Sequence, residues 1–518
     1  MNSEALDALG LVLAVCALAL AYLRWLRVAQ REHYLPGYTV RFARRWWGSG
    51  TFNRLLGVIG VAGAVVSVWW APALFAAIAA PAAGPIGLAL RGKTSKLVWT
   101  GRLRRLTIVS SVMAALPIAA IGALAGLRGA ASTAAFAALG APVLVDLALW
   151  ATRAPEARLL APYVARASQR LRSVGPRVVA ITGSYGKTTT KGYVAHLVGG
   201  AMSVVASPAN FNNTAGLARA LNDHLATGTQ VFVAEMGTYG PGEIAAMCEW
   251  VTPEVAVITA LGPVHLERMG SLENIAEAKA EILEKARAAI VNVDYPLLEQ
   301  LAQKAEEEGK TVWRCSSNGP LADVTVTSED GGFRVRVKHF SAEMDLVIAA
   351  APAVDPGNVA CAVAAALSLG VPAEIVASRL ESLPGAPHRR TPQRASNGAS
   401  VIDDTYNANP AGAKAALGLL GTTAAPDGKK VVVTPGMVEL GPVQARENAN
   451  FAASAGAVAT QLLVVGRTNA RALLGGARAA GLPARYVRNR PAAVAWVSAN
   501  LGPGDAVLYE NDLPDHYP

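Results

Sequence analysis

The feature that most constrains the fold of this chain is a stretch of 36 residues, 55–90, without a single charged side chain. About 20 apolar residues in a helix cross the ~30 Å hydrocarbon core of a bilayer, so the stretch is too long for one crossing. Ala71-Pro72 lies near its middle, where a turn would divide it into two helices. Trp69 and Trp70 stand beside this turn, as amphipathic rings do at a membrane interface. The stretch therefore predicts two membrane helices.

Three further apolar stretches are long enough to cross a bilayer, and they are residues 5–23, 106–127 and 129–152. The first is followed by a basic and aromatic segment instead of a signal-peptide cleavage site, so we expect it to remain as an anchor. The sequence thus predicts an α-helical transmembrane domain with five spans. A four-span alternative, with a re-entrant segment at Pro81 and Pro85, remains open.

The net charge of +10 comes entirely from this part of the chain. Residues 1–154 hold 15 Lys and Arg against 4 Asp and Glu, whereas the rest holds 32 against 33. Basic loops at 24–54 and 91–105 are expected in the cytoplasm, which also places everything after the last span there. This distribution indicates membrane topology and argues against nucleic-acid binding. Asp146 in the last span is either a charge that reaches the headgroups or a functional intramembrane carboxylate.

Beyond about residue 175, short runs of Val, Ala and Ile alternate with longer amphipathic stretches, which predicts βαβ units around a parallel sheet. The expected strands are 177–181, 230–235, 255–259, 289–293, 400–404, 430–434, 461–465 and 506–509. Alternation with period two over 322–349 predicts a small antiparallel element, and a helix is expected at 358–369. The four cysteines are scattered without a CxxC pair and are interpreted as reduced thiols.

The strongest local motif is ITGSYGKTTTK at 181–191, which follows a predicted strand and opens a helix. In such a loop backbone N–H groups close around phosphate oxygens, a lysine reaches the β- and γ-phosphates and a hydroxyl binds Mg²⁺. The spacing GxxGKTT is shorter at its glycine end than the general GxxxxGK[ST] loop. A generic glycine turn is the alternative, which the Gly-Lys-Thr sequence disfavours. The expected ATP contacts are Gly183, Ser184, Gly186, Lys187, Thr188 and Thr189.

Further motifs follow this loop in a fixed order. They are SPANFNNTAGL (207–217), VAEMG (233–237), LGPVHLERMGSLENIAEAKAEIL (261–283), PHRR (387–390), IDDTYNANP (402–410) and GMVELG (436–441). With these motifs, residues 160–510 resemble the ATP-dependent Mur ligases, and most closely the branch that adds D-alanyl-D-alanine. The resemblance implies a P-loop central ATP-binding domain at 155–385 and a smaller Rossmann-like α/β domain at 386–518, after the transmembrane domain at 1–154. It also implies that the chain is an enzyme of peptidoglycan precursor synthesis, which forms amide bonds through an acyl phosphate.

The resemblance further implies roles for a metal-binding group of residues. Thr188 and Glu235 would hold Mg²⁺ between the β- and γ-phosphates, and His265 would help to hold a second Mg²⁺. Lys279 would be carbamylated, which converts a cation into an anionic metal ligand. Lys187, His265 and Lys279 are the expected catalytic residues, because a carboxylate that approaches a γ-phosphate needs charge neutralisation. Taken alone, Glu235 could cap a turn and Lys279 could lie on a solvated helix face.

The remaining nucleotide contacts are expected in two places. Asn213, beside Asn212, would orient nucleotide or acceptor, although adjacent asparagines are also common turn formers. By resemblance, Arg389 would reach the phosphates, with Arg390 as the alternative. Asp404 would accept from the ribose hydroxyls, and a set of side chains would line the cleft between the domains; these are Tyr406, Asn407 and Asn409. Such groups come from a separate domain, so closure is expected before catalysis.

Two departures from the family pattern leave the substrates open. A soluble domain that grips UDP is replaced by the membrane spans, and the family's terminal GDxVLxKGSR reads GDAVLYENDLPDHYP at 504–518. The expected partners are ATP, a peptidoglycan-precursor-like carboxylate acceptor, an amine donor and membrane lipid. Alternatives are a poly-γ-glutamate synthase-like ligase with a lipid-linked or polymer acceptor, and a non-catalytic membrane scaffold. A lipid II amidating ligase is disfavoured, since those usually carry a four-cysteine zinc ribbon.

Overall fold

A computed structural model describes residues 3–90, 96–209, 211–319, 322–329, 331–339, 342–349, 354–384, 392–405, 409–513 and 516–517. The chain forms two compact units. Unit 1 comprises Met1–Leu159, Gly466–Thr468 and Leu513–Pro518, and unit 2 comprises Leu160–Val465 and Asn469–Asp512.

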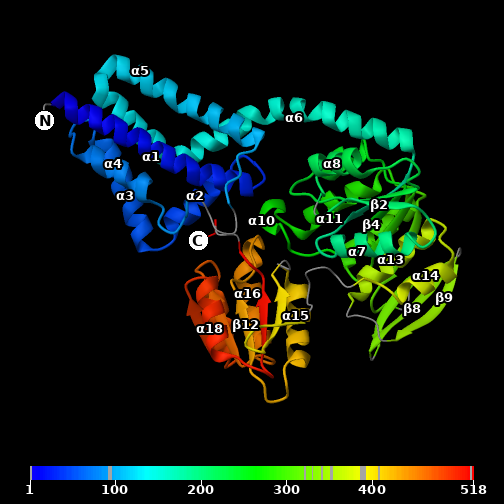
Figure 1. The fold of residues 1–518 in the computed structure, drawn as a ribbon. Coiled ribbons are helices and arrows are strands. Elements are labelled where there is room, and N and C mark those ends of the chain that lie inside the picture. The colour runs from blue at the N-terminus through cyan, green and yellow to red at the C-terminus, as the bar shows by residue number, and fades with distance from the viewer. Residues whose placement is uncertain are drawn as a thin grey trace. The chain divides into compact units, whose positions relative to one another are not determined.

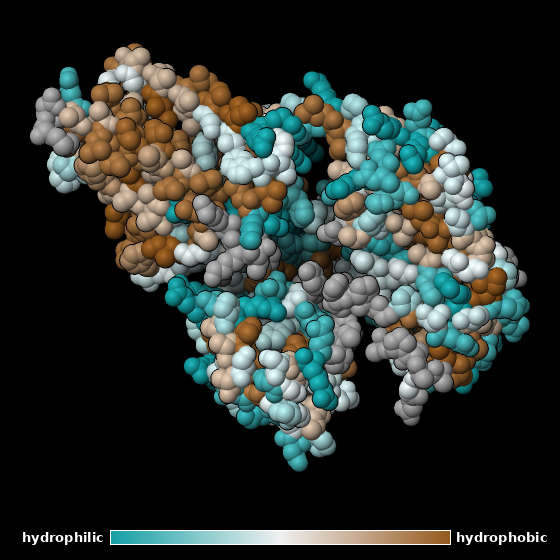
Figure 2. Space-filling view, viewed as in Figure 1, coloured by the Kyte–Doolittle hydropathy of each residue, from teal (hydrophilic) through white to brown (hydrophobic). Residues whose placement is uncertain are grey.

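Unit 1 is helical and carries an apolar surface. Its elements are α1 (Ser3–Arg31), α2 (Tyr38–Gly48), α3 (Thr51–Val66), α4 (Ala73–Ala83), α5 (Gly101–Leu139) and the first half of α6 (Ala141–Val174) (Figure 1). Helix α1 packs along α5 and α4. Hydrophobic side chains gather on the outside of these helices (Figure 2), and many large ones are exposed, including Leu124 at 84% and Trp69 at 77%. Exposed apolar area of this extent is expected for a surface that contacts lipid or protein.

Two described helices, Glu4–Arg31 and Gly101–Leu139, are long and apolar enough to cross a bilayer, and α2 with α3, bent by 113°, would make a third if the pair counts as one span. The turn expected near Trp69 and Trp70 is confirmed, but α4 has only 11 residues. At 1.5 Å per residue it is about 16 Å long, shorter than the ~30 Å core. Whether unit 1 inserts in a membrane, and with how many spans, therefore remains a prediction.

The break expected between 106–127 and 129–152 is present in the structure, at Gly126. Helix α5 consists of two helical segments that meet in a kink at this glycine (φ 71°, ψ −169°), and the second segment ends before Gly140. Helix α6 then continues past residue 152 as far as Val174. A Cβ built on Gly122 would lie 3.2 Å from the Cβ of Ala130, eight residues later, so the two segments fold back on one another, which a continuous helix does not allow.

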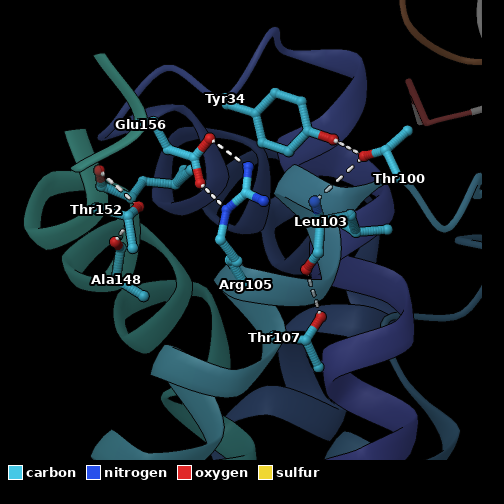
Figure 3. A network of polar contacts seen from close by, with 9 residues as sticks. Tyr34, Thr100, Leu103, Arg105, Thr107, Ala148, Thr152 and Glu156 are labelled. Carbon is cyan, nitrogen blue, oxygen red and sulfur yellow. Dashed lines mark hydrogen bonds and ion pairs between the residues drawn. The ribbon is translucent and has the colours of Figure 1, made fainter. Parts of the chain in front are cut away.

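Polar contacts join the helices of unit 1 (Figure 3). Arg105 donates from Nε and Nη2 to the two carboxylate oxygens of Glu156, at 2.6 and 2.8 Å, which connects α5 to α6. The hydroxyls of Tyr34 and Thr100 lie 3.3 Å apart, and Thr100 accepts a hydrogen bond from the backbone N–H of Leu103 as the N-cap of α5.

Residues near the end of the sequence also pack inside unit 1. His516 Nε2 lies 3.0 Å from Glu32 Oε1, and both side chains are buried. The indole of Trp46 donates to the carbonyl oxygen of His516 at 2.8 Å. The rings of Phe42 and Tyr517 meet edge to face at 4.9 Å. The chain thus leaves unit 1 along α6 and returns to it near residue 516.

Unit 2 contains a nine-stranded sheet in the order β2-β3-β1-β4-β5-β6-β7-β8-β9. Its strands are β1 (Arg177–Thr182), β2 (Val204–Ala206), β3 (Val231–Glu235), β4 (Val255–Ile258), β5 (Ala288–Asn292), β6 (Thr311–Ser316), β7 (Val324–Glu329), β8 (Gly332–His339) and β9 (Ala342–Ala349). Neighbours from β2 to β7 are parallel, and β7, β8 and β9 pair antiparallel. The four strands and the antiparallel element expected here are confirmed.

Helices cover both faces of this sheet. The cover of one face includes α7 (Lys187–Val198), α13 (Pro356–Ser368) and α14 (Ala373–Leu380). The other face carries α8 (Thr214–His224), α9 (Glu243–Cys248), α11 (Leu272–Ala280) and α12 (Pro296–Glu307). Alternate residues of β1 enter the two cores, so the strand is apolar throughout, as parallel strands buried on both sides are. The loops at the carboxyl ends of β1, β3 and β4 therefore meet at one edge.

The second sheet of unit 2 has six strands in the order β10-β11-β15-β12-β13-β14. They are β10 (Pro392–Arg394), β11 (Ser400–Asp404), β12 (Lys430–Thr434), β13 (Gln461–Val465), β14 (Ala484–Val487) and β15 (Ala506–Glu510). All are parallel except β10. The flanking helices are α15 (Pro410–Thr423), α16 (Gln444–Ala455), α17 (Ala470–Ala479) and α18 (Arg490–Asn500). The four strands expected in this region are confirmed, and the sheet is a smaller α/β domain.

Candidate active site

The glycine-rich loop connects the end of β1 to the start of α7. Gly186 has φ 76°, in the left-handed region, and a Cβ built on it would lie 2.1 Å from Oδ1 of Asn358 in α13. A side chain is therefore excluded at this position by both backbone conformation and space. The Ser184 hydroxyl lies 3.1 Å from the Gly262 carbonyl oxygen and 3.0 Å from its N–H, which fixes the loop against the segment after β4.

Lys187 and Thr188 form the first turn of α7. Nζ of Lys187 donates to the carbonyl oxygen of Gly183 at 2.8 Å, and Thr188 donates from its hydroxyl to Oε2 of Glu235 at 2.9 Å. Thr189 follows and is half-buried. Backbone N–H groups and the positive end of the helix dipole lie at the same turn, which is a favourable place for phosphate.

Glu235 ends β3 and is buried among polar partners. Besides Thr188, its carboxylate accepts from Nδ2 of Asn212 at 3.1 Å and pairs with Nζ of Lys191 at 3.0 Å. Lys191 and Glu235 are 7% and 2% exposed, so this ion pair is shielded from water. Lys191 also donates to the carbonyl oxygen of Ala209 at 2.7 Å. The Glu235 carboxylate contacts Thr188 and Lys191 of α7 and the side chain of Asn212, so the geometry does not support a turn-capping role.

His265 connects the two sheets of unit 2. It has φ 62°, and its Nδ1 lies 2.5 Å from Oε2 of Glu439, which belongs to the GMVELG segment after β12. Arg268 donates to the other oxygen of Glu439 at 2.7 Å. Because this carboxylate orients the imidazole through Nδ1, the Nε2 lone pair is the one available to a metal ion.

Burial and hydrogen bonding shift the pKa values of this pair. Burial alone would raise the pKa of Glu439, but hydrogen bonds and charge from His265 and Arg268 lower it to about 2. Burial lowers the pKa of His265 by more than the hydrogen bond and charge of Glu439 raise it, and the positive charges of Arg268 and Lys187 also lower it. The hydrogen bond to the Glu439 carboxylate requires a proton on Nδ1 of His265, and the lowered pKa of His265 favours the neutral imidazole, the form that binds metal ions.

Lys279 lies in the last turn of α11 and is 4% exposed, so the solvated helix face considered above is excluded. Helix α11 ends at Ala280, and a 3₁₀ turn follows at Glu281–Leu283. Burial and, secondarily, the charge of Lys187 lower the pKa of Lys279 to about 7. A substantial fraction of this amine is therefore uncharged near neutral pH, as carbamate formation with CO₂ requires.

The three expected catalytic residues are thus gathered at one edge of the sheet. Lys187 acts electrostatically on both His265 and Lys279, while Thr188 contacts Glu235. Within the described part of the chain, no group of three or more His, Cys, Asp or Glu side chains is arranged to hold a metal ion. A hydroxyl and a carboxylate oxygen 2.9 Å apart nevertheless suit Mg²⁺, which commonly takes its other ligands from water and substrate phosphates.

Other expected contact residues have structural partners. Asn213 caps α8 by accepting from the N–H of Gly216 at 2.9 Å, and Asn409 caps α15 by accepting from that of Gly412 at 2.8 Å. Asp404 is fully buried beside Glu510, its partner in the parallel register. The remaining expected contacts lie outside the described residues; these are Arg389, with its alternative Arg390, Tyr406 and Asn407. The roles of all these residues toward nucleotide remain predictions.

Four residues of the site were not identified from sequence. Lys191 and Glu439 stand within motifs that were recognised, so their positions carried a signal although no role was assigned. Arg268 lies three residues after His265, on the same turn. Asn358 offers no local signal, because its contact with Gly186 joins segments far apart in sequence.

Two family models match the chain beyond residue 180. The first, described as the Mur ligase middle domain, matches residues 181–366, and the second, described as the Mur ligase glutamate ligase domain, matches residues 388–509. These segments contain most of the two sheets of unit 2 and the site residues described above. The family pattern therefore coincides with the region in which the candidate site lies.

Individual relatives give the same result. The chain is 31% identical over 376 residues to a UDP-N-acetylmuramoyl-tripeptide--D-alanyl-D-alanine ligase of Mycobacterium tuberculosis, covering 67% of this chain and 73% of that one. It is 34% identical to the Bacillus subtilis ligase of that name, covering 53% and 59%. The MurF ligase of Thermotoga maritima in complex with ADP superposes with TM-score 0.57 at 25% identity, over 68% of this chain and 80% of that one.

Proposed function

Because the chain belongs to the Mur ligase family, we propose that it is an ATP-dependent ligase that joins D-alanyl-D-alanine, or a similar amine, to the carboxylate of a peptidoglycan precursor. The observation that carries the proposal is the approach of Lys187, His265 and Lys279 around the loop that also brings Thr188 to Glu235. A nucleotide-binding loop alone would serve any phosphate chemistry. The added histidine and buried lysine are what the family uses for carboxylate activation.

In the proposed reaction, a carboxylate oxygen of the acceptor attacks the γ-phosphorus of ATP and ADP leaves, which gives an acyl phosphate. The amine of the donor then attacks the carbonyl carbon, phosphate leaves, and the amine loses a proton. Lys187 and the N–H groups at the start of α7 offset negative charge on the phosphates during the first step. The backbone contact of Lys187 to Gly183 would be exchanged for a phosphate oxygen when ATP binds.

We infer that Mg²⁺ is bound by Thr188 and Glu235, and that His265 and a carbamylated Lys279 hold a second ion. These ions would neutralise the phosphates and the acceptor carboxylate. Lys191 supports this arrangement, since its Nζ pairs with the buried Glu235 carboxylate at 3.0 Å and holds it beside Thr188. The lowered pKa of Lys279 supports its modification by CO₂.

The apolar surface of unit 1 supports attachment to the inner or plasma membrane, with unit 2 in the cytoplasm where ATP is available. It also favours a second candidate substrate. A lipid-linked acceptor would be confined to the same membrane surface as the enzyme, which raises its effective concentration. Unit 1 would then take part in acceptor binding.

The proposal is tested on full-length protein in detergent with ATP, Mg²⁺, UDP-MurNAc-tripeptide and D-alanyl-D-alanine. We expect stoichiometric release of phosphate and a pentapeptide product detected by mass spectrometry, both absent in Lys187→Ala. Asp223→Asn, on the exposed surface of α8, is the matched control and should retain activity. If ATP binds but no pentapeptide forms, a lipid-linked tripeptide acceptor replaces the UDP-linked one. Failure with both acceptors would refute the proposed activity.

A further inference from the structure

A pocket of about 670 Å³ lies between α2 and α6 in unit 1. Three arginines of α2 line it, Arg41, Arg44 and Arg45, together with apolar side chains of α6. Its volume falls within the range of ~300–1,000 Å³ that is usual for small-molecule sites. The pocket is remote in sequence from the ligase motifs, and the ligase reaction proposed above gives it no role.

The architecture of α2 determines which side chains reach the pocket. Phe42 and Trp46 on one side of the helix are buried in the core of unit 1, which leaves the arginines on the others. Arg41 lies over the ring of Tyr38 at 5.2 Å and Arg45 over that of Phe42 at 5.3 Å. Such stacking limits the freedom of each guanidinium group and orients its N–H donors before a ligand arrives.

Asp146 also lines the pocket, but its carboxylate already has partners. It accepts from the backbone N–H groups of Thr39 and Val40, at 3.3 and 2.9 Å, and so caps the start of α2. This is a structural role, distinct from the two considered from sequence. Because the helix N-terminus balances the charge of Asp146, this carboxylate does not compete with a ligand for the arginines that line the pocket.

The opposite wall of the pocket is apolar and open. Val143, Leu147 and Trp150 follow one another on α6 at helical spacing, and they are 49%, 48% and 72% exposed. A cluster of guanidinium groups beside an exposed apolar stripe suits a ligand with an anionic head and an apolar tail. Guanidinium forks match the oxygens of phosphate, and several of them favour a group with more than one negative charge.

We propose that this pocket binds the phosphate or pyrophosphate head of a membrane lipid, with the lipid chain along Val143, Leu147 and Trp150. The inference rests on the proposed membrane attachment of the ligase. It also names the chemical class to which a lipid-linked acceptor would belong. The arginines act as the specificity determinants for the charged head, and the apolar stripe adds affinity for the lipid chain that a small soluble anion lacks.

The test is native mass spectrometry of full-length protein in detergent with hexadecyl phosphate as the probe. We expect saturable binding, weakened at least tenfold in the triple variant R41Q/R44Q/R45Q. The control R104Q/R153Q/R158Q removes the same charge from exposed arginines of unit 1 outside the pocket and should bind within twofold of the wild type. Binding is measured without turnover, so a protein that lacks the proposed ligase activity still gives a result.

Two further variants keep the result interpretable. If the triple variant does not fold, Arg44→Gln alone, at an exposed position, should still weaken the probe several-fold. Trp150→Ala should weaken hexadecyl phosphate and leave inorganic phosphate unaffected. Unchanged probe binding in the arginine variants would overturn the proposal. Equal affinity for inorganic phosphate or pyrophosphate and for the probe would also overturn it, because the site would then serve a free anion.

Discussion

Replacing Lys191 by methionine should destabilise unit 2 through the charge that it leaves behind on Glu235. The two groups are 3.0 Å apart and 7% and 2% exposed. At an effective dielectric constant of ~20, their attraction is about 5 kcal/mol, and breaking a buried pair from one side typically costs 3–5 kcal/mol. For a domain of this size, a loss of that order lowers the unfolding temperature by about 10 °C.

The decisive measurement is a double-mutant cycle read by thermal unfolding of the full-length protein in detergent. Lys191→Met alone should show the full loss. In a Glu235→Gln background the same change leaves no carboxylate unpaired and removes a buried cation that has lost its partner, so it should cost about 1 kcal/mol at most, the worth of the Lys191 hydrogen bond to Ala209. If Lys191→Met is equally costly in both backgrounds, the ion pair is not what stabilises this site.

Three other outcomes follow from the geometry. Lys279 should incorporate ¹³CO₂ as a carbamate, seen by NMR at about pH 8. The carbamate should be lost below about pH 6, because the amine, whose pKa is lowered to about 7, becomes protonated. The signal should be absent in Lys279→Met, and its persistence in that variant would exclude this residue. The pKa of Glu439 is lowered from 4.5 to about 2, so its ionised form contributes stability above pH 4.5 that is lost as the pH falls toward 2. The decrease of the unfolding temperature between pH 4.5 and 2 should therefore be smaller in Glu439→Gln than in the wild type. Gly186→Ala, whose Cβ would lie 2.1 Å from Asn358, should lower the free energy of unfolding by more than about 2 kcal/mol. The control Gly228→Ala, with φ 86° and nothing within 4 Å, should lower it by about 1 kcal/mol. Equal losses in the two variants would refute the steric argument.

The strands of unit 2 were predictable because a parallel strand buried on both faces is a short apolar run with a distinct beginning and end. Those that were missed lack this signature. Strand β2 has three half-buried residues, and three of the four residues of β14 are exposed. Strand β6 carries Arg314 and Thr311 among its apolar residues, so its pattern is broken. Burial on one face or at an edge leaves too weak a signal in composition.

The helices of unit 1 were harder to delimit from sequence. Apolar composition identifies a segment that avoids water, but it does not say where the helix turns. Gly122 and Gly126 are equally small and lie in the same apolar run, yet only the second breaks the helix. The difference lies in the packing of neighbouring helices, which a local pattern does not contain.

Some residues of the candidate site could also be predicted from the sequence, and others could not. The phosphate loop was predictable because its residues are adjacent and each has a chemical reason to be there. The contact of His265 with Glu439 joins residues of different sheets, and only the folded chain brings them together. Asn212 and Asn213 are adjacent and chemically identical, so only the backbone direction decides that the first contacts Glu235 and the second caps a helix.

The return of His516 and Tyr517 to unit 1 gives the polypeptide the topology of a closed loop. While this contact holds, the intervening segment of roughly 350 residues cannot explore the conformations of a chain with a free end, which amounts to about 5 kcal/mol of entropy for a loop of that length. The contact thus acts on unit 2 as a reversible cross-link would, by restricting its unfolded state. Partial unfolding of unit 2 would pull on the pair of His516 and Glu32, and release of that pair would make unfolding of the remainder more favourable.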